Sequence, residues 1–330
     1  MRELSVVIPT RNRADSLART LRSLEGQTLP REAFEVIVVD NGSTDATPAV
    51  VVAAARTAGN VRGVVEPEPG LHAGRHRGLR EAGADVLVYA DDDIEAEPGW
   101  LAGMRAAFER PEVDLAGGPC RPAFEQTPPA WLQAWWERGV RGGRALGYLS
   151  ILDLGPGQRP VSPYYVWGCN FGVRRGVIEA AGGFHPDALP SGLALRRGDG
   201  ETWISDVVAA SGRVALYTGA AAVRHHVPAA RMTVPFFERR AYNQGLSDSY
   251  TVLRARLMPA VPATTRRRAR TLAAVYRLKA VLARLPAAGT LGRVRRRLHR
   301  ASLRGYREHA RAAAADDALR AWVTRADYLE

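Results

Sequence analysis

Short apolar runs alternate with helix-like segments over the first part of the chain. Strands are predicted at residues 4–8, 36–39, 61–65 and 86–89, where apolar side chains dominate. Helices are predicted between them at 16–26 and 75–82, and an Ala- and Val-rich helix is predicted after residue 45. This alternation predicts an α/β fold with a mostly parallel sheet that helices cover on both faces.

The pattern becomes less regular after residue 116. Residues 117–165 are rich in Gly, Pro and Trp, and they predict loops with one short helix that would form a wall of a cleft. Helices are expected at 174–182 and 200–211, and a strand is expected at 214–217. From about residue 235 onward the pattern is helical.

Polar side chains follow three of the predicted strands at their carboxyl ends. They are Thr10 and Arg11, then Asp40 and Asn41, and finally the triplet at 91–93. Ligands of parallel sheets bind beyond the carboxyl ends of the strands. We therefore expect these three groups to converge on one crevice.

The aspartate triplet at 91–93 is the most informative of these groups. Three adjacent carboxylates repel one another unless positive charge is near, and a hard divalent cation with substrate phosphates is the usual solution. The alternative is an exposed acidic turn that caps a helix, but the position after a buried strand favours a metal site. Asp40, which precedes Asn41 and Gly42, is by itself more typical of a turn than of a ligand.

Three further segments could carry chemistry. The glycine-rich basic segment 70–78 allows close backbone approach, and its Arg75 could pair with a phosphate or orient a base. The segment 198–201 offers a carboxylate that is either a helix cap or a general base. Of the neighbours His225 and His226, at most one is a natural ligand because they point in different directions on an extended chain; a surface pair is the alternative.

Charge is distributed unevenly along the chain. The net charge is +12, and residues 251–330 hold 19 Arg and Lys against 5 Asp and Glu. The two cysteines cannot form a disulfide framework. The sequence has neither the pattern of a secretory signal nor an uncharged apolar stretch of membrane-spanning length. We expect a cytoplasmic location, with peripheral contact at the cytoplasmic membrane face as an option.

Together these segments resemble glycosyltransferase family 2, which has the GT-A fold. Order and spacing match across roughly residues 3–235. The resemblance rests on segments 4–13, 38–45 and 72–79, on the Asp-x-Asp-like motif at 90–93 with Pro98, Trp100 and Leu101, and on 168–171, 182–184, 198–201 and 223–228.

The resemblance implies roles for individual residues. Asp93 would ligate Mn²⁺ or Mg²⁺ together with Asp91, which could instead contact the ribose, and His225 would approach the metal and the diphosphate. Glu201 or Asp199 would be the catalytic base, and the spacing to the end of the following helix favours Glu201. The implied donor-binding residues are Pro9, Thr10, Arg11, Arg13, Asp40, Asn41, Arg75, Asp91 and Asp92, and the implied acceptor-side residues are Trp167, Asn170 and Trp203.

The implied reaction is an inverting, metal-assisted single displacement. A sugar would move from a nucleotide diphosphate sugar to an acceptor hydroxyl that a carboxylate deprotonates. The acceptor would be a glycan, a lipid-linked molecule or a small molecule. The expected organisation is a GT-A domain at 1–234, with a nucleotide-sugar-binding half at 1–115 and an acceptor-side half at 116–234, followed by an Arg-rich helical region at 235–330.

The basic C-terminal region lies outside the resemblance and has several interpretations. Its arginines could be solvated faces of packed helices, a contact with an anionic membrane, or a site for an acidic acceptor. The leucine side of 270–285 could also form a homodimer. Nucleic acid is disfavoured, because the helices contain few aromatic residues and no known fold signature.

Two other functions are alternatives. A nucleotidyltransferase has a similar scaffold, but it would normally carry a glycine-rich loop directly after the first strand, which segment 10–13 lacks. A non-catalytic nucleotide-sugar-binding or scaffold protein, attached through the basic tail, would be favoured by a degraded acidic site. Asp91, Asp93 and Glu201 are all present.

Overall fold

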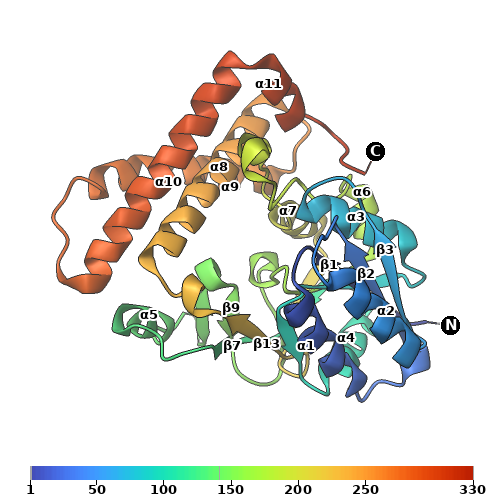
Figure 1. The fold of residues 1–330 in the computed structure, drawn as a ribbon. Coiled ribbons are helices and arrows are strands. Elements are labelled where there is room, and N and C mark those ends of the chain that lie inside the picture. Colours follow the sequence, from blue (N-terminus) through green and yellow to red (C-terminus); the bar gives the residue numbers. More distant parts are fainter. Residues whose placement is uncertain (1, 141, 330) are drawn as a thin grey trace.

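The computed structural model describes residues 2–140 and 142–329, and its centre is an eight-stranded sheet of order β10-β12-β6-β11-β4-β1-β2-β3 (Figure 1). β1 pairs in parallel with β2 and β4, and β2 pairs in parallel with β3, which gives the mostly parallel sheet that the sequence predicted. β11 is antiparallel to both of its neighbours. The strands are β1 (Leu4–Thr10), β2 (Phe34–Asp40), β3 (Val61–Val65), β4 (Val86–Ala90), β6 (Val113–Gly117), β10 (Gln158–Pro160), β11 (Asn170–Arg174) and β12 (Val214–Thr218).

Helices cover both faces of this sheet, because its central strands are apolar on both sides. Val6 and Ile8 share one core with Leu17 and Trp100, whereas Val7 lies in a second core on the opposite face. The first face carries α1 (Ala14–Glu25), α2 (Thr47–Thr57) and α4 (Trp100–Phe108). The second face carries α3 (Leu71–Glu81), α6 (Arg175–Ala180) and α7 (Thr202–Ser211).

Helix α3 begins four residues before the predicted start, so most of the glycine-rich segment 70–78 is helical rather than a loop. Its glycines let the helix lie close to β1. A Cβ atom at Gly78 would lie 2.1 Å from Cγ1 of Val7. Close packing against the sheet, rather than contact with a ligand, therefore explains this glycine.

The segment expected to consist of loops contains strands instead, which corrects the prediction for 117–165. A five-stranded sheet has the order β5-β13-β7-β9-β8, and α5 (Ala130–Trp136) is the predicted short helix. Its strands are only three to five residues long, which is too short to give a strong local signal. They are β5 (Ile94–Ala96), β7 (Cys120–Phe124), β8 (Arg144–Leu146), β9 (Ile151–Asp153) and β13 (Val223–Val227).

The last part of the chain is helical, as predicted, and gathers at one end of the molecule in Figure 1. Helices α8 and α10 cross closely, since a Cβ atom at Gly245 would lie 2.1 Å from the carbonyl oxygen of Ser302. The chain then returns to the α/β part, where the amide of Tyr328 donates to the carbonyl of Gly182. The helices are α8 (Val234–Leu257), α9 (Ala263–Leu282), α10 (Gly289–Ala315) and α11 (Asp317–Val323).

Short 3₁₀ turns connect several elements, at Arg31–Ala33, Gly147–Leu149, Pro163–Tyr165, Ser191–Arg196 and Ala229–Arg231. Within the described residues, no helix contains a stretch apolar and long enough to cross a lipid bilayer.

Candidate active site

The carboxyl ends of the parallel strands bring the predicted polar groups together. β1 and β2 are in register from Leu4 to Thr10, which places Thr10 beside Asp40. The hydroxyl of Thr10 donates to Oδ2 of Asp92 at 2.7 Å, so the end of β1 contacts the loop that follows β4. The convergence expected from the sequence is therefore present in the structure.

The three aspartates after β4 point in different directions. Asp92 is buried and turns toward β1, where Thr10 and Arg13 contact it; Nε of Arg13 lies 3.0 Å from Oδ1 of Asp92. Nη2 of Arg13 also lies 2.8 Å from Oδ2 of Asp93. Arg13 thus supplies the positive charge that adjacent carboxylates require, and it links the segment after β1 to the acidic loop after β4.

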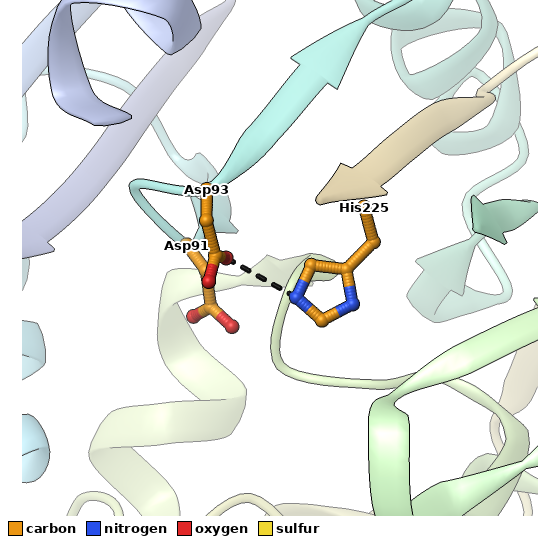
Figure 2. A group of neighbouring side chains, drawn as sticks. All are labelled: Asp91, Asp93 and His225. Carbon is orange, nitrogen blue, oxygen red and sulfur yellow. Dashed lines mark ion pairs between the residues drawn. The ribbon is translucent and has the colours of Figure 1, made fainter. Parts of the chain in front are cut away.

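Asp91, Asp93 and His225 form one cluster (Figure 2). One potential ligand atom from each lies within 4.8 Å of the others. His225 reaches the cluster from β13, while His226, the next residue, turns away and its Nε2 contacts Glu95 at 2.6 Å. The alternation of an extended strand thus selects one of the two adjacent histidines.

Polar atoms of this cluster lack hydrogen-bond partners among the described residues. They are Oδ1 of Asp93 and both ring nitrogens of His225. Nε2 of His225 lies 3.2 Å from Oδ1 of Asp93, which is an ion-pair distance, but the two atoms do not have hydrogen-bond alignment. Buried carboxylate and imidazole atoms that face one another without a hydrogen bond fit a divalent cation, for which both are suitable ligands.

The electrostatics of the cluster favour bound positive charge. Burial raises the pKa of Asp91, and the neighbouring Asp93 raises it further. Burial also raises the pKa of Asp92 to about 7, although Arg13 opposes this shift. Burial disfavours the charged form of His225, but Asp93 outweighs this effect and raises the pKa of His225 to about 9. A cation at this site would therefore take the place of a proton on His225.

A cleft of about 500 Å³ opens beside the cluster. Nη2 of Arg231, which follows β13, lies 2.9 Å from Oδ2 of Asp93 in this cleft. The cleft is lined by the predicted Pro9, Thr10, Arg11, Arg13, Asn41, Asp91, Asp92, Asp93 and His225, and also by Gly70, Leu71, Tyr148, Leu149, Ser150, Ala188, Leu189, Pro190, Arg231, Phe236 and Arg240.

Glu201 and Arg75 form a pair near this cleft. Nη1 of Arg75 lies 3.3 Å from Oε2 of Glu201, and Nη2 of Arg75 donates to the carbonyl of Gly168 at 3.4 Å. Arg75 is buried, whereas 28% of the Glu201 side chain is exposed. Neither Arg75 nor Glu201 lines the cleft, and the contacts of Arg75 fit the orientation of a carboxylate better than contact with a phosphate.

Asp199 has a different environment from Glu201, although only Gly200 separates them. Its side chain is buried, and its oxygens contact Nδ1 of His185 at 2.6 Å and Nη2 of Arg268 at 2.5 Å. The hydroxyl of Thr251 donates to Asp199 as well, at 2.8 Å. These partners contact both carboxylate oxygens of Asp199, so Glu201 is the more accessible of the two candidate bases.

Asp40 and Asn41 make turn contacts. Oδ1 of Asp40 accepts a hydrogen bond from the amide of Ser43 at 2.8 Å. The amide group of Asn41 donates to the carbonyls of Glu66 and Glu68, and its oxygen accepts from the amide of Gly70. Asn41 thereby fixes the loop that leads to α3, and it also lines the cleft.

The predicted acceptor-side residues do not line the cleft. The Asn170 side chain is buried, accepts from Nε1 of Trp100 and donates to two backbone carbonyls. The indole of Trp203 donates to the carbonyl of Ala181 and stacks on His185 with ring centroids 4.5 Å apart. Trp167 is half-buried, so it is the most accessible of the three.

Sequence reasoning missed several residues that line the cleft. Tyr148 to Ser150 come from the segment expected to be loops, and Ala188 to Pro190 precede a 3₁₀ turn. Arg240 lies on α8, beyond the GT-A domain expected at 1–234. No local motif marks these positions, because the chain fold alone brings them to the cleft.

The mostly parallel sheet and the acidic cluster beyond its strand ends define an α/β protein with the GT-A fold. A solved structure of the same fold supports this class: a mannosyltransferase from Pyrobaculum calidifontis in complex with GDP-Man and Mn²⁺ matches with a TM-score of 0.54 and 20% identity, over 100% of this chain and 85% of that one. The sequence model for glycosyl transferase family 2 matches residues 5–182. The chain belongs to this family, and the resemblance predicted from sequence is confirmed.

Curated relatives include glycosyltransferase AglE from Haloferax volcanii, 32% identical over 116 residues, which cover 35% of this chain and 38% of AglE. The pre-mycofactocin glycosyltransferase of Mycobacterium tuberculosis is 29% identical over 252 residues, which cover 68% of this chain and 48% of that protein. The chain thus spans less than half the length of these relatives. Family membership argues against the nucleotidyltransferase alternative.

Proposed function

We propose that the protein is an inverting glycosyltransferase that moves a sugar from a nucleotide diphosphate sugar to an acceptor hydroxyl with the help of a divalent cation. The observation that carries this proposal is the cluster of Asp91, Asp93 and His225 beside the cleft, in which buried atoms of Asp93 and His225 lack hydrogen-bond partners. Family membership supports glycosyl transfer in general. Residues 1–234 would form the transferase domain, and residues 235–330 the Arg-rich helical region.

The donor would lie across the strand ends. Pro9, Thr10 and Arg11 line the cleft on the β1 side, and Asn41 lines it beside β2. Asp93, Asp91 and His225 would hold Mn²⁺ or Mg²⁺, which would neutralise the charge that develops on the departing diphosphate. Arg13 and Arg231 both contact Asp93, so they can place further positive charge near the same phosphates.

Glu201 would be the general base. It would accept the proton of the acceptor hydroxyl while the acceptor oxygen bonds to the anomeric carbon and the bond to the diphosphate breaks. Arg75 would orient this carboxylate, as the 3.3 Å contact suggests. Asp199 would position the loop, since its oxygens are occupied by His185, Arg268 and Thr251.

On the acceptor side, Trp167 is the residue that we propose to contact the acceptor directly, because part of its side chain is accessible. Asn170 and Trp203 would instead support the wall of the cleft through their hydrogen bonds. The acceptor would be a glycan, a lipid-linked molecule or a small molecule that carries a hydroxyl.

A thermal-stability assay with nucleotides tests the proposal. UDP, GDP, dTDP and CDP are each added with Mn²⁺ or with chelator, to the wild type and to Asp93→Ala. A ligand at about 100 times its Kd adds about 2.7 kcal/mol to stability. One nucleotide should stabilise the wild type only with metal, and Asp93→Ala should lose this effect.

Asp85→Asn is the matched control, because Asp85 precedes β4 at the opposite end of the strand and its side chain is 69% exposed. It should retain the nucleotide effect. The donor site would be refuted if no nucleotide stabilises the wild type, or if Asp93→Ala responds as the wild type does.

A further inference from the structure

Helix α9 and the residues just after it carry a row of large aliphatic side chains that face away from the protein. We call Val275, Leu278, Val281, Leu282 and Leu285 the α9 stripe; all five are exposed, Leu278 by 57% and Val281 by 56%. The opposite side of the helix makes the internal contacts, where Tyr276 and Ala283 pack with Leu303 of α10. The stripe therefore follows the helical repeat but contributes little to the core.

The stripe lies in a segment without acidic residues. Residues 249–307 contain 16 Arg and Lys and no Asp or Glu. Arg270, Arg277 and Arg284 are exposed and seven residues apart, which places them along one flank of the stripe. No ion pair of these three side chains occurs within residues 2–140 and 142–329.

A basic hollow adjoins this flank. It lies between α9 and α10 and has a volume of about 690 Å³. Five arginines line it, and Glu308 is the one carboxylate among the lining residues that the structure describes. The lining arginines are Arg284, Arg300, Arg304, Arg307 and Arg311. A hollow of this kind suits a phosphate-bearing headgroup.

The combination of features selects among partners. A second copy of the chain would bring two segments of like charge together, which opposes association. Nucleic acid offers negative charge but nothing that would bury aliphatic side chains. A lipid surface with anionic headgroups offers an apolar layer for the stripe and phosphates for the arginines beside it.

We propose that the α9 stripe and its flanking arginines dock this protein on a lipid surface that carries anionic headgroups. The helix would lie in the plane of the interface, with its aliphatic side chains among the acyl chains. Docking is separate from the proposed transfer reaction, because none of the stripe residues or flanking arginines lines the cleft beside Asp93.

Vesicle flotation with the full chain tests docking. The probes are vesicles of phosphatidylcholine alone and vesicles of phosphatidylcholine mixed with phosphatidylglycerol. Two variants separate the contributions: Leu278→Ser with Val281→Ser and Leu285→Ser, and Arg270→Gln with Arg277→Gln and Arg284→Gln. We expect the wild type to bind the anionic vesicles, and each triple variant to bind about tenfold or more weakly.

The matched control comes from helix α2, which also has an exposed valine and an exposed arginine. The double variant Val52→Ser with Arg56→Gln should bind the anionic vesicles as the wild type does. Binding of the wild type should also weaken as the salt concentration rises, because the Debye screening length falls from about 10 Å at 0.1 M to about 3 Å at 1 M. This salt test needs no variant and holds even if a triple variant folds poorly.

Docking is refuted if the wild type does not bind anionic vesicles, or if it binds neutral vesicles equally well. It is also refuted if folded triple variants bind as the wild type does. If sedimentation reveals a dimer that the stripe variant abolishes, and vesicles do not bind, the stripe is instead an interface between two copies.

Discussion

Arg268 of α9 bridges two carboxylates that lie on either side of Glu201 in the sequence. Its Nη2 lies 2.5 Å from Oδ2 of Asp199 and 2.6 Å from Oδ2 of Asp206. The guanidinium is mostly buried and both carboxylates are buried. Replacement of Arg268 by Gln should therefore leave two buried carboxylates without their cation.

The neighbouring His185 does not substitute for this cation. Burial lowers the pKa of His185 to about 4, despite the opposing effect of Asp199, so at neutral pH its ring donates a hydrogen bond but carries no charge. Burial opposes ionisation of Asp199, and its contacts with His185 and Arg268 nevertheless hold its pKa below the usual range. Because His185 is neutral, Arg268 is the main source of positive charge.

The expected loss of stability is about 3–5 kcal/mol, the usual cost when one partner of a buried ion pair is removed. The unfolding entropy of a 330-residue chain is about 0.7 kcal/mol/K, scaled from its length. Arg268→Gln should therefore lower Tm by about 4–7 °C at pH 7. Arg267→Gln, an exposed change on the same helix, should move Tm by about 1 °C or less.

The pH dependence identifies the cause. The lowered pKa of Asp199 means that its contribution to stability is present above the unfolded pKa of about 4 and is lost as pH falls below it. Burial raises the pKa of Asp206, which means that its ionised form lowers the stability of the folded protein. This destabilisation grows when Arg268 is removed, and it disappears when Asp206 is protonated. Both effects predict that the Tm difference is largest near pH 7 and narrows below pH 4.

Thermal unfolding followed by circular dichroism at several pH values measures this difference. A Tm of Arg268→Gln equal to that of the wild type at pH 7 would refute the charge argument. A difference of the same size at every pH would also refute it, because lost packing rather than lost charge would then be the cause.

Three further predictions concern other parts of the molecule. Glu201→Gln should retain metal-dependent stabilisation by the nucleotide but lose sugar transfer by about 10²-fold or more, which donor-turnover assays would detect. Gly245→Ala should destabilise by about 1–3 kcal/mol because its Cβ would meet the carbonyl of Ser302 at 2.1 Å, whereas Gly292→Ala on α10 should not destabilise, and denaturant titration would compare them. Cys120 and Cys169 should react with Ellman's reagent only after unfolding, because both thiols are buried. The contact with Cys120 and the burial of the thiol also raise the pKa of Cys169, which lowers its reactivity further.

Much of the parallel half of the fold could be predicted, because local sequence patterns dictate it. β1, β2 and β4 are apolar on both faces, and the polar residues directly after them must meet at one edge of a parallel sheet. Helix caps were less predictable. The amide of Ala14 at the start of α1 donates to Oδ2 of Asp45 from another loop, at 3.2 Å.

The remaining part depends on contacts between distant segments. β13 brings His225 to Asp93 because it pairs with β5, the strand directly after the acidic loop, and that pairing joins positions about 130 residues apart. The environment of Asp199 is set by Arg268, which lies 69 positions later on α9. A motif at 198–201 therefore reveals two carboxylates but cannot show which one is enclosed. Arg268 of α9 encloses Asp199 together with His185 and Thr251, so the basic helical region, which lies beyond the family match, helps to determine which acid of the motif stays accessible.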